Sequence, residues 1–500
     1  MLKKLSDLIS RRPLIGWLAF FSIMLVVFLL GLLAASITER RAEIATLLAN
    51  RKIEIQALEG RNDVWGVNYP RQYQSWKKTA LMDFNSKYNS NHFEDLLEQR
   101  PNMVVLWAGL AFAIDYNAPR GHMYAVQDLY ATLRTGGPET LEENNQKGNC
   151  WTCKSSDFPR MIAQLGVDAF YSSPWSKYGH EVVNPIGCAD CHDPETMKLT
   201  ITRPALIKGL EMRGMDVSNA TVQEMRSLVC AQCHVEYYFS GPNSTITFPW
   251  KHGFSGEDME KHLDEVGHND WVHALSRAPM IKPQHPDYEI FLYGTHAKKG
   301  VSCADCHMPY MAEGGIKFSS HHITSPLRDI GRTCLTCHRD SEDNLRALVY
   351  GHQDKLAEIR DILEPTLVKA HLMAKHAWDN GATEAQMAKS LQLIRQAQWR
   401  WDFVVASHGA AFHAPVESQR LFSHALDRAL QAQIELYKVL VALKVNPEFK
   451  MPDISTKDKA QAFIGLDMKQ RREKKQRFLD NVVPGWLKKA KENNRLSASL

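Results

Sequence analysis

The sequence has no cysteine outside a Cys-x-x-Cys pair, because its 10 cysteines fall into five such pairs. It also carries little net charge, formally +4 at pH 7, which gives no indication of nucleic-acid binding. The pairs recur without a fixed period, so the chain is not a solenoid of repeats. Strand signals are few in the middle of the chain. What is present is a 500-residue chain with a 44% apolar share, enough for a globular core.

The cysteine pairs carry the strongest chemical signal. Four of the five are followed at once by a histidine, which completes the Cys-x-x-Cys-His attachment signature of c-type haem. Disulfides, zinc ribbons and thioredoxin-like pairs share the cysteine spacing but do not explain the histidines. We therefore predict five covalently bound haems inside the protein, each held by two thioethers with the next residue beneath the iron. The motifs are Cys150/Cys153/Lys154, Cys188/Cys191/His192, Cys230/Cys233/His234, Cys303/Cys306/His307 and Cys334/Cys337/His338.

One motif departs from the other four, because Lys154 stands where they have a histidine. A lysine must be deprotonated to bind iron, and burial beside a metal cation favours that form. Two strong ligands are typical of electron-transfer haems, whereas chemistry requires an open sixth position. We predict an open position on the iron above Lys154; the alternative is a second ligand supplied by a histidine from elsewhere in the chain.

The N-terminal residues 1–37 form a membrane anchor or a signal segment. Pro13 to Ile37 is almost wholly apolar and long enough to span a bilayer. We favour an uncleaved anchor over a cleaved signal, although small residues at 34–36 would suit a signal peptidase. The positive flank stays in the cytoplasm, so the rest of the chain lies on the periplasmic side of a bacterial inner membrane. The flanking charges are Lys3, Lys4, Arg11 and Arg12 before the segment, and Glu39, Arg40 and Arg41 after it.

The remaining chain divides by pattern, and the predicted fold is mainly α. Residues 38–64 are expected to form a helical stalk. Residues 65–340 hold every cysteine pair and are rich in turn residues, which indicates short helices and long loops around haems. Apolar residues at a 3.6 period predict long helices over 341–443, which cover the haems and offer a dimer surface. Residues 444–500 are charged and are expected to be a solvated helix and frayed tail, so that 65–443 forms one domain.

Four histidine-ligated haems that only carry electrons would need four more histidines on their other faces. The sequence has 21 histidines in all, so counting alone does not identify these ligands. Local context marks a few candidates, which lie in loops near the motifs or in the helical part. They are His122, His296, His321, His322 and His413.

At this level of detail the chain resembles a known family. The CWTCK motif at 150–154, the four Cys-x-x-Cys-His motifs after it and the run CAQCHVEYYF at 230–239 are similar to the pentahaem cytochrome c nitrite reductases, which form ammonia. The resemblance covers about residues 65–440. It implies a mostly helical multihaem cytochrome fold, a homodimer formed through long C-terminal helices, and six-electron reduction of nitrite to ammonium at the lysine-ligated haem.

The resemblance also implies a set of catalytic residues beside Lys154. The family has an arginine, a tyrosine and a histidine in its distal pocket. Tyr237 in HVEYY and His285 in KPQHPD match the last two. Arg134 in TLRTG matches the arginine, and Arg120 in PRGH is its rival, expected instead beside a haem ligand.

The family binds calcium next to this pocket, through a glutamate, a glutamine side chain and two backbone carbonyls. The matching residues are Glu236, Gln284, Tyr237 and Lys282. All four offer oxygen donors, as a hard cation requires.

The resemblance further assigns the second ligands of the four histidine haems. It pairs His122 with the third haem, His322 with the second, His413 with the fourth and His296 with the fifth. The adjacent His321 leaves the second assignment open by one residue.

The resemblance and the membrane segment together favour a membrane quinol-oxidising cytochrome c as electron donor, with a soluble donor as the alternative. Three other functions remain open at this stage. They are a multihaem electron-transfer cytochrome, a related reductase that acts mainly on sulfite or hydroxylamine, and a structural or storage protein with zinc at the cysteine pairs.

Overall fold

The computed structural model describes residues 12–49, 51–88, 91–141, 143 and 146–497, without the side chains of 39–49. Lys3, Lys4 and Arg11 lie outside the described residues, as do the side chains of Glu39, Arg40 and Arg41. The chain forms two compact units, Met1–Glu54 and Ile55–Leu500, and each is considered by itself.

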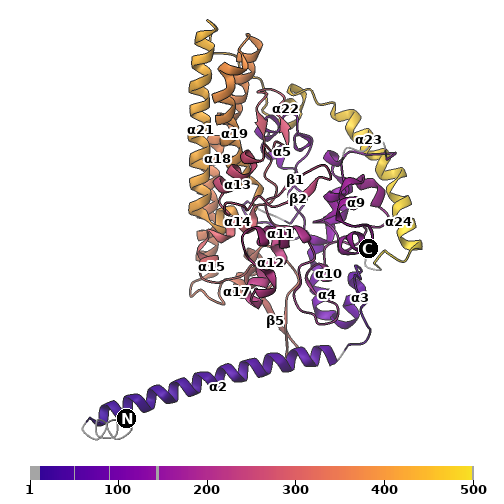
Figure 1. The fold of residues 1–500 in the computed structure, drawn as a ribbon, viewed down its shortest axis with the longest axis vertical. Helices are drawn as coiled ribbons and strands as arrows, with labels where there is room; N and C mark the ends of the chain where they lie inside the picture. The colour runs from indigo at the N-terminus through magenta and orange to yellow at the C-terminus, as the bar shows by residue number, and fades with distance from the viewer. Residues whose placement is uncertain (1–11, 50, 89–90, 142, 144–145, 498–500) are drawn as a thin grey trace. The chain divides into compact units, whose positions relative to one another are not determined.

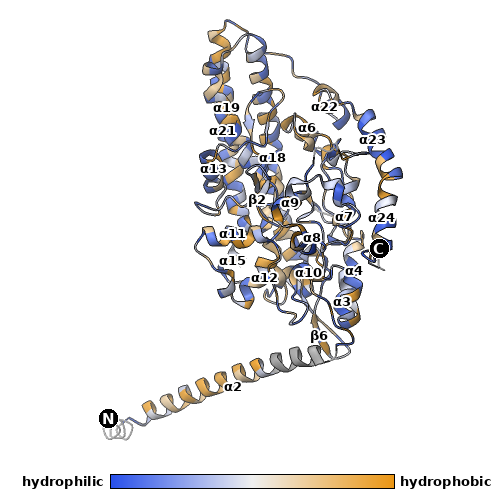
Figure 2. Cartoon of the chain, turned by 45° about the vertical axis from the view of Figure 1, so that its right-hand side comes forward, coloured by the Kyte–Doolittle hydropathy of each residue, from blue (hydrophilic) through white to orange (hydrophobic). Residues whose placement is uncertain are grey.

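The first unit is dominated by one helix, α2 (Pro13–Ala49). Its stretch Pro13–Thr38 has a mean hydropathy of 2.8, and its apolar part is orange in Figure 2. A helix of 26 apolar residues is long enough to cross a membrane, a property that signal sequences near an N-terminus share. The predicted anchor and the start of the predicted stalk thus form a single helix.

The predicted helical stalk over 38–64 is only partly helical. Beyond Ala49 no helix is described until α3 (Asn62–Asn68) begins in the second unit. The reason lies in packing, because Ile55 is buried in a small apolar cluster with Trp65 and Tyr69. These contacts favour an irregular chain over a continued helix at this point.

The second unit begins with short helices connected by loops, as the turn residues of 65–340 predict (Figure 1). Two of them, α10 and α16, start at the first cysteine of an attachment motif. One helical turn places residues i and i+3 on the same face, so the two thiols point together. The helices are α3, α4 (Pro70–Lys77), α5 (Leu96–Gln99), α6 (Asn102–Leu106), α7 (Ala125–Ala131), α8 (Phe158–Leu165), α9 (Val167–Ser172), α10 (Cys188–Cys191), α11 (Pro204–Met212), α12 (Val222–Ala231), α13 (Gly256–Glu265), α14 (Asp287–Leu292), α15 (Thr295–Lys298), α16 (Cys303–His307) and α17 (Ile330–Thr333).

Strands are short in this unit. The described residues form three antiparallel two-stranded hairpins, and none joins a larger sheet. The hairpins are β1 (Tyr238–Ser240) with β2 (Thr245–Thr247), β3 (Trp271–Val272) with β4 (Pro279–Met280), and β5 (Tyr310–Glu313) with β6 (Ile316–Ser319).

Three long helices pack side by side and form the bundle seen in Figure 1. They are α18 (Glu342–Asp379), α19 (Glu384–Ala406) and α21 (Pro415–Ala442), with the short α20 (Ala410–His413) between the last two. Ser341 caps α18 and Thr383 caps α19, each accepting a backbone hydrogen bond from the first turn. The periodic apolar residues of 341–443 therefore predict this part of the fold well.

The C-terminal residues differ from the expected frayed tail. They form α22 (Lys457–Phe463), α23 (Met468–Asn481) and α24 (Val483–Glu492), on the side of this unit away from the bundle in Figure 1. Phe478 is fully buried between the rings of Trp175 and Trp486, with centroids 5.9 and 5.3 Å away. A narrow apolar face within a charged run is enough to fix these helices, here called the C-terminal arm. Residues 498–500 lie outside the described part.

Candidate haem-binding and catalytic site

The structure brings the histidine of each Cys-x-x-Cys-His motif opposite a second histidine. Two imidazoles that bind one metal from opposite faces, with bonds of about 2 Å, have ring centroids about 6 Å apart. Each of the four pairs has this spacing, so each could hold one iron between its rings. The centroid distances are 6.1 Å for His192–His321, 6.4 Å for His122–His234, 6.3 Å for His307–His413 and 6.0 Å for His296–His338.

Hydrogen bonds orient several of these rings. The Nδ1 atoms of His192, His307 and His321 lie 2.9–3.0 Å from backbone carbonyl oxygens. A ring that donates its Nδ1 hydrogen to a carbonyl keeps Nε2 free as a metal ligand. The rings are thus held in the tautomer that iron coordination needs.

The fifth motif differs from the others in the exposure of its second cysteine. Cys337 is exposed, whereas the other nine cysteines are all partly buried. Cys337 lies at the outer end of the turn formed by the fifth motif, between α17 and α18. Its neighbours Thr336 and His338 are exposed as well. Cys334, at the inner end, packs against an apolar cluster beneath the turn.

The second motif is the one place where geometry and the expected axial ligand differ. The ring opposite His192 belongs to His321 and not to His322. The backbone N–H of His321 donates to Ser75 Oγ at 2.9 Å, which anchors this loop to a distant helix. His322 lies beside the charges of Arg328 instead, where burial and that charge lower the pKa of its imidazole to about 4.

A glycine makes room for the ligand opposite His307. A Cβ atom on Gly409 would lie 2.3 Å from Cε1 of His413, closer than any side chain allows. The missing side chain lets the ring of His413 turn back over the short helix α20. This glycine carries no signal in the sequence, because it is followed by other small residues.

The turn at Lys154 is held by a buried arginine that the sequence analysis did not identify. Arg203 is 1% exposed and donates hydrogen bonds to the carbonyl oxygens of Thr152 and Ser155, both at 2.9 Å. Its guanidinium also pairs with Asp190 of the second motif at 2.5 Å. One buried ion pair therefore fixes both sides of the lysine and ties the first motif to the second.

The three predicted catalytic side chains gather around the same turn. Burial lowers the pKa of His285, and the positive charge of Lys154 lowers it further. Burial raises the pKa of Tyr237, and the neighbouring thiols of Cys153 and Cys150 act in the same direction. Both side chains are therefore within electrostatic range of the lysine motif.

Arg134 approaches this motif from the other side. It lies in the 3-10 helix Leu133–Thr135, whose backbone is held by the carboxylate of Asp115. Its side chain is 28% exposed, and its guanidinium lies 3.6 Å from Asp115. Burial raises the pKa of the Cys150 thiol to about 11. The positive charges of Lys154 and Arg134 act in the opposite direction, so the guanidinium of Arg134 is within electrostatic range of this motif.

Arg120, the rival of Arg134, is committed elsewhere. Its guanidinium forms an ion pair with Asp128 and lies 3.8 Å from the ring centroid of Tyr124. The pair holds Arg120 next to the loop of His122, as its position in the sequence suggested. The structure thus leaves Arg134 as the arginine nearest the lysine motif of the two.

A second half-buried histidine, His408, faces His285. The ring centroids of His285 and His408 are 6.1 Å apart, although neither residue follows a cysteine pair. A ring spacing of about 6 Å is therefore not enough to identify a haem site, because an attachment motif must be present as well. The sequence analysis missed His408, since it lies in the helical part far from every motif.

The residues expected to bind calcium form a buried cluster of oxygen atoms. Glu236 is 1% exposed; its Oε2 accepts a hydrogen bond from the backbone of Gln284 at 2.6 Å, and its Oε1 has no partner. The side-chain amide of Gln284 lies 2.9 Å from the carbonyl oxygen of Lys282. Burial raises the pKa of Glu236 well above its usual range. A buried carboxylate oxygen without a partner, next to the segment that carries the Lys282 carbonyl and the Gln284 side chain, fits a hard divalent cation.

Lys282 contributes only its backbone to this cluster. Its ammonium points away and pairs with the buried Asp402 at 2.7 Å. Asp402 also accepts a hydrogen bond from the indole of Trp107 at 2.8 Å. This network fixes the segment that presents the Lys282 carbonyl and neutralises the ammonium charge with a buried carboxylate.

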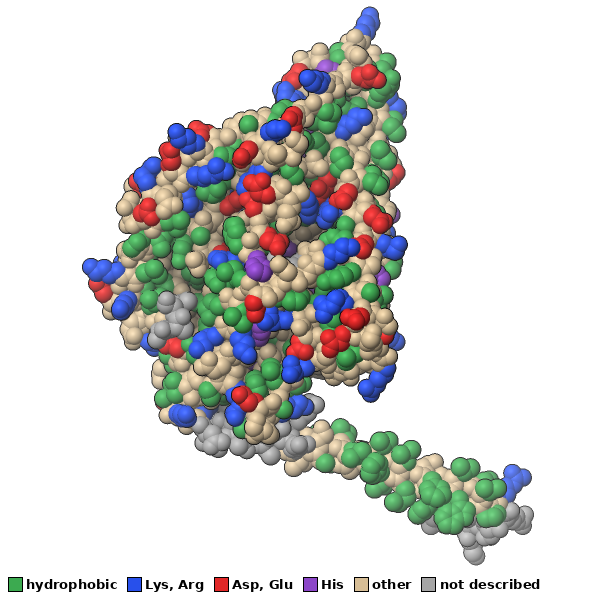
Figure 3. All heavy atoms as spheres, turned by 180° about the vertical axis from the view of Figure 1, so that it is seen from behind, with side chains coloured by type: hydrophobic (Ala, Val, Ile, Leu, Met, Phe, Trp, Pro, Cys, Tyr) green, Lys and Arg blue, Asp and Glu red, His purple; other side chains and the backbone are tan. Residues whose placement is uncertain are grey.

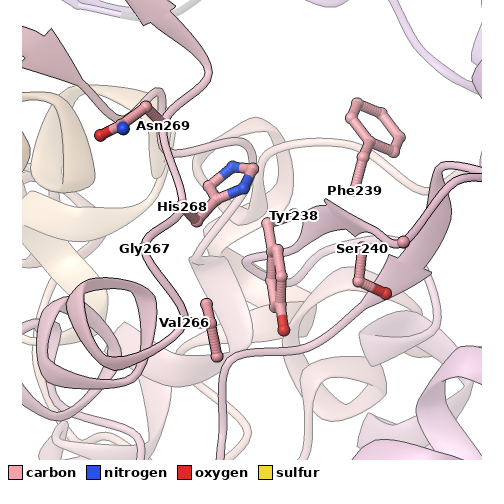
Figure 4. A pocket seen from close by; sticks show the side chains of 8 residues that line it. Tyr238, Phe239, Ser240, Val266, Gly267, His268 and Asn269 are labelled. Atoms are coloured by element: carbon pink, nitrogen blue, oxygen red, sulfur yellow. The ribbon is translucent and has the colours of Figure 1, made fainter.

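An open hollow of about 450 Å³ lies nearby, lined by residues 238–241 and 266–269. In Figure 4 the ring of Tyr238 lies next to that of His268, with centroids 5.0 Å apart. The lining includes none of the predicted catalytic residues. The outer surface in Figure 3 mixes Lys and Arg with Asp and Glu, in keeping with the small net charge.

Comparison with known proteins agrees with this geometry. The family model for cytochrome c552 matches residues 61–495. The cytochrome c-552 of Bacteroides fragilis ATCC 25285 is 58% identical over 482 residues, which cover 96% of this chain and 98% of the relative. That of Parabacteroides distasonis is 57% identical, covering 97% of this chain and 98% of the relative.

A solved structure shares the fold. The catalytic subunit of cytochrome c nitrite reductase from Desulfovibrio desulfuricans, described with two calcium sites, superposes with a TM-score of 0.75. It is 31% identical and covers 84% of this chain and 91% of its own. The mainly helical multihaem fold predicted from the motifs is confirmed. On the extent of these matches, the chain belongs to the cytochrome c552 family.

Proposed function

We propose that this protein reduces nitrite to ammonium. The reaction consumes six electrons and eight protons and releases two waters for each nitrite. The observation that supports it most is that Arg134, Tyr237 and His285 gather at the one motif that has a lysine in place of histidine. The structural neighbour that is a cytochrome c nitrite reductase supports the same substrate.

Five covalently bound haem c groups supply the redox chemistry, four as electron carriers and one as the site where nitrite is reduced. The four paired histidines would hold the carriers, namely His192 with His321, His234 with His122, His307 with His413 and His338 with His296. Lys154 would be the protein ligand of the fifth, with Arg203 holding its turn in place.

The side chains around Lys154 suit an anionic substrate. Arg134 offers a positive charge and several N–H donors to the nitrite oxygens, and it stabilises negative charge while N–O bonds break. His285 and Tyr237 are the nearby side chains able to deliver protons to those oxygens. Both residues are half-buried, so their polar atoms are partly shielded from bulk water.

One calcium ion would complete the oxygen cluster beside this pocket. Glu236 and Gln284 would bind it through their side chains, and Tyr237 and Lys282 through their carbonyl oxygens. Tyr237 and His285 lie in the two segments that the ion would join. Bound calcium would therefore keep these two proton donors at fixed positions relative to each other. Its charge would also attract nitrite.

The cellular setting follows from α2. We propose that it anchors the protein on the periplasmic side of the bacterial inner membrane, where c-type haems are attached. A membrane quinol-oxidising cytochrome c is the electron donor that this location favours. A cleaved signal sequence would favour a soluble donor.

A homodimer formed through the long helices is supported by an uncovered apolar stripe on α21. Leu430, Ile434, Tyr437 and Val441 recur at helical spacing and are 47–55% exposed. Such a stripe on a helix of a water-soluble unit is typical of a surface covered by a second copy. Helix α21 would thus pack on the bundle with one face and on the partner with the other.

The first test measures ammonium formed per nitrite consumed by the reduced, haem-loaded protein. We expect a ratio near one, and we expect Lys154→His to keep five haems while losing most of this activity. The physical reason is that a histidine ligand converts the lysine site toward the electron-transfer type. A wild-type protein that transfers electrons without consuming nitrite would contradict the proposal, and full activity of Lys154→His would contradict the role of Lys154.

The second test separates the two candidate arginines. Arg134→Ala should lower kcat/KM for nitrite on the order of 100-fold, since it removes a charge from the pocket. Arg120→Ala is the matched control, because Arg120 is already paired with Asp128, and it should change kcat/KM by less than about threefold. Steady-state kinetics with equal haem content decide between them, and the reverse pattern would assign nitrite binding to Arg120.

The third test concerns the ligand opposite His192. His321→Ala should convert one of the low-spin haems to high spin, because it removes a strong axial ligand. His322→Ala, one residue away, should leave all spin states unchanged. Electron paramagnetic resonance of the two oxidised variants gives the answer, and a spin change in His322→Ala alone would restore the original expectation.

The fourth test removes the calcium. Glu236→Gln should weaken calcium binding on the order of 10- to 100-fold and lower nitrite reduction, with activity restored by added calcium. Glu265→Gln, at an exposed position, is the control. Calorimetric titration after chelation measures the affinity. Equal calcium affinity of Glu236→Gln and wild type would place the ion elsewhere.

A further inference from the structure

The helices of the C-terminal arm reach the loop that carries Arg134. The side chain of Lys475 on α23 is buried, with 4% exposure. Its ammonium donates to the carbonyl oxygen of Tyr130 at 2.8 Å and to Thr135 Oγ1 at 3.2 Å. These two acceptors lie on either side of Arg134 in the chain. A single ammonium therefore joins the end of α7 to the 3-10 helix of the arginine.

The approach between the arm and this loop is close at the backbone as well. Gly137 follows the arginine loop, and a Cβ atom added there would lie 2.8 Å from the carbonyl oxygen of Lys474. On the surface, Arg477 pairs with Glu139 at 3.0 Å, and Lys474 pairs with Glu143. The contact thus extends over several residues on both segments.

The arm also holds the residue that anchors Arg134 from the other side. Gln461 on α22 is fully buried and donates to the carbonyl oxygens of Ala113 and Ile114 at 3.0 and 2.8 Å. The next residue is Asp115, whose carboxylate accepts the backbone hydrogen bonds of Leu133 and Arg134 at 2.6 and 3.1 Å. Both supports of the arginine loop are therefore fixed by the same arm.

Lys475 also acts on the charges of the site. Burial lowers the pKa of its ammonium to about 7, the Asp115 carboxylate opposes this shift, and the positive charge of Arg134 adds to it. Lys475, Asp115 and Arg134 thus form one interacting set. A lysine that only filled space would not require two hydrogen-bond acceptors and a carboxylate in this arrangement.

We propose that Lys475 is a positioning residue for Arg134, which fixes the arginine loop in the geometry that binds nitrite. This inference rests on the proposed nitrite reduction. Lys475 does not touch the substrate; it acts through Tyr130, Thr135 and the loop between them. Gln461 has the same role toward Asp115.

The test compares an anionic and a neutral substrate in the full-length, haem-loaded protein. Lys475→Met keeps the length of the side chain and removes the ammonium. It should raise KM for nitrite roughly five- to tenfold, with kcat at saturation changed by less than about twofold. KM for hydroxylamine, which is uncharged at neutral pH, should stay within about twofold. Lys475→Arg, which keeps the donors, should recover most of the nitrite affinity.

Two further variants keep the result decisive. Lys469→Met changes an exposed lysine on the same helix and should leave both KM values unchanged. If Lys475→Met does not accumulate with five haems, Thr135→Val removes one acceptor and should raise KM for nitrite in the same direction.

The outcomes separate this inference from the function on which it rests. A wild-type protein without nitrite reduction overturns both. An active wild type with unchanged KM for nitrite in Lys475→Met, or in Thr135→Val where that variant is used, overturns the inference alone. Equal rises in KM for nitrite and hydroxylamine would show general loosening of the pocket and would also overturn it.

Discussion

The spacing between opposed imidazole rings is the constraint on which the rest of this structure depends. A cysteine pair fixes one ring beneath an iron, and the chain must then supply a second ring about 6 Å away. The four second rings come from different kinds of segment, namely a loop (His321), a 3-10 helix (His122) and the short helices α15 (His296) and α20 (His413). Each such pairing crosslinks distant parts of the chain, which explains how one domain forms with little sheet structure.

The two residues between the cysteines supply a second level of order. Asp190 pairs with Arg203, and Gln232 accepts a hydrogen bond from the Arg203 backbone at 3.0 Å while donating to the Asp190 carbonyl at 3.0 Å. Asp305 pairs with Arg226 at 2.8 Å. These contacts connect successive motifs directly. Direct contacts between the motifs would keep the spacing of attached haems fixed.

Much of this could be predicted from sequence, because the attachment motifs are local and the long helices have a clear period. Lys154 was identified in this way, whereas the pairing of His122, His296 and His413 with particular motifs came from the family resemblance. The choice between His321 and His322 could not be predicted from sequence, because it depends on a hydrogen bond from the His321 backbone to Ser75, 246 residues away. The exposure of Cys337 was not foreseen either, because the motif alone does not tell which end of its turn meets solvent. Arg203 and Lys475 were missed for a similar reason: a buried charge is recognised only by its partners. The charged composition of residues 444–500 also gave no indication of the C-terminal arm. A few apolar side chains among many charged ones determine how its helices pack.

The contacts of Gln461 and Lys475 have a consequence for the order in which the protein is completed. A chain that crosses a membrane from its N-terminus presents all five attachment motifs before the arm emerges. The haem at the lysine motif can therefore be attached while the arginine loop still lacks its supports. The contacts of Gln461 and Lys475 with the segments around Arg134 are thus among the last that the growing chain can form.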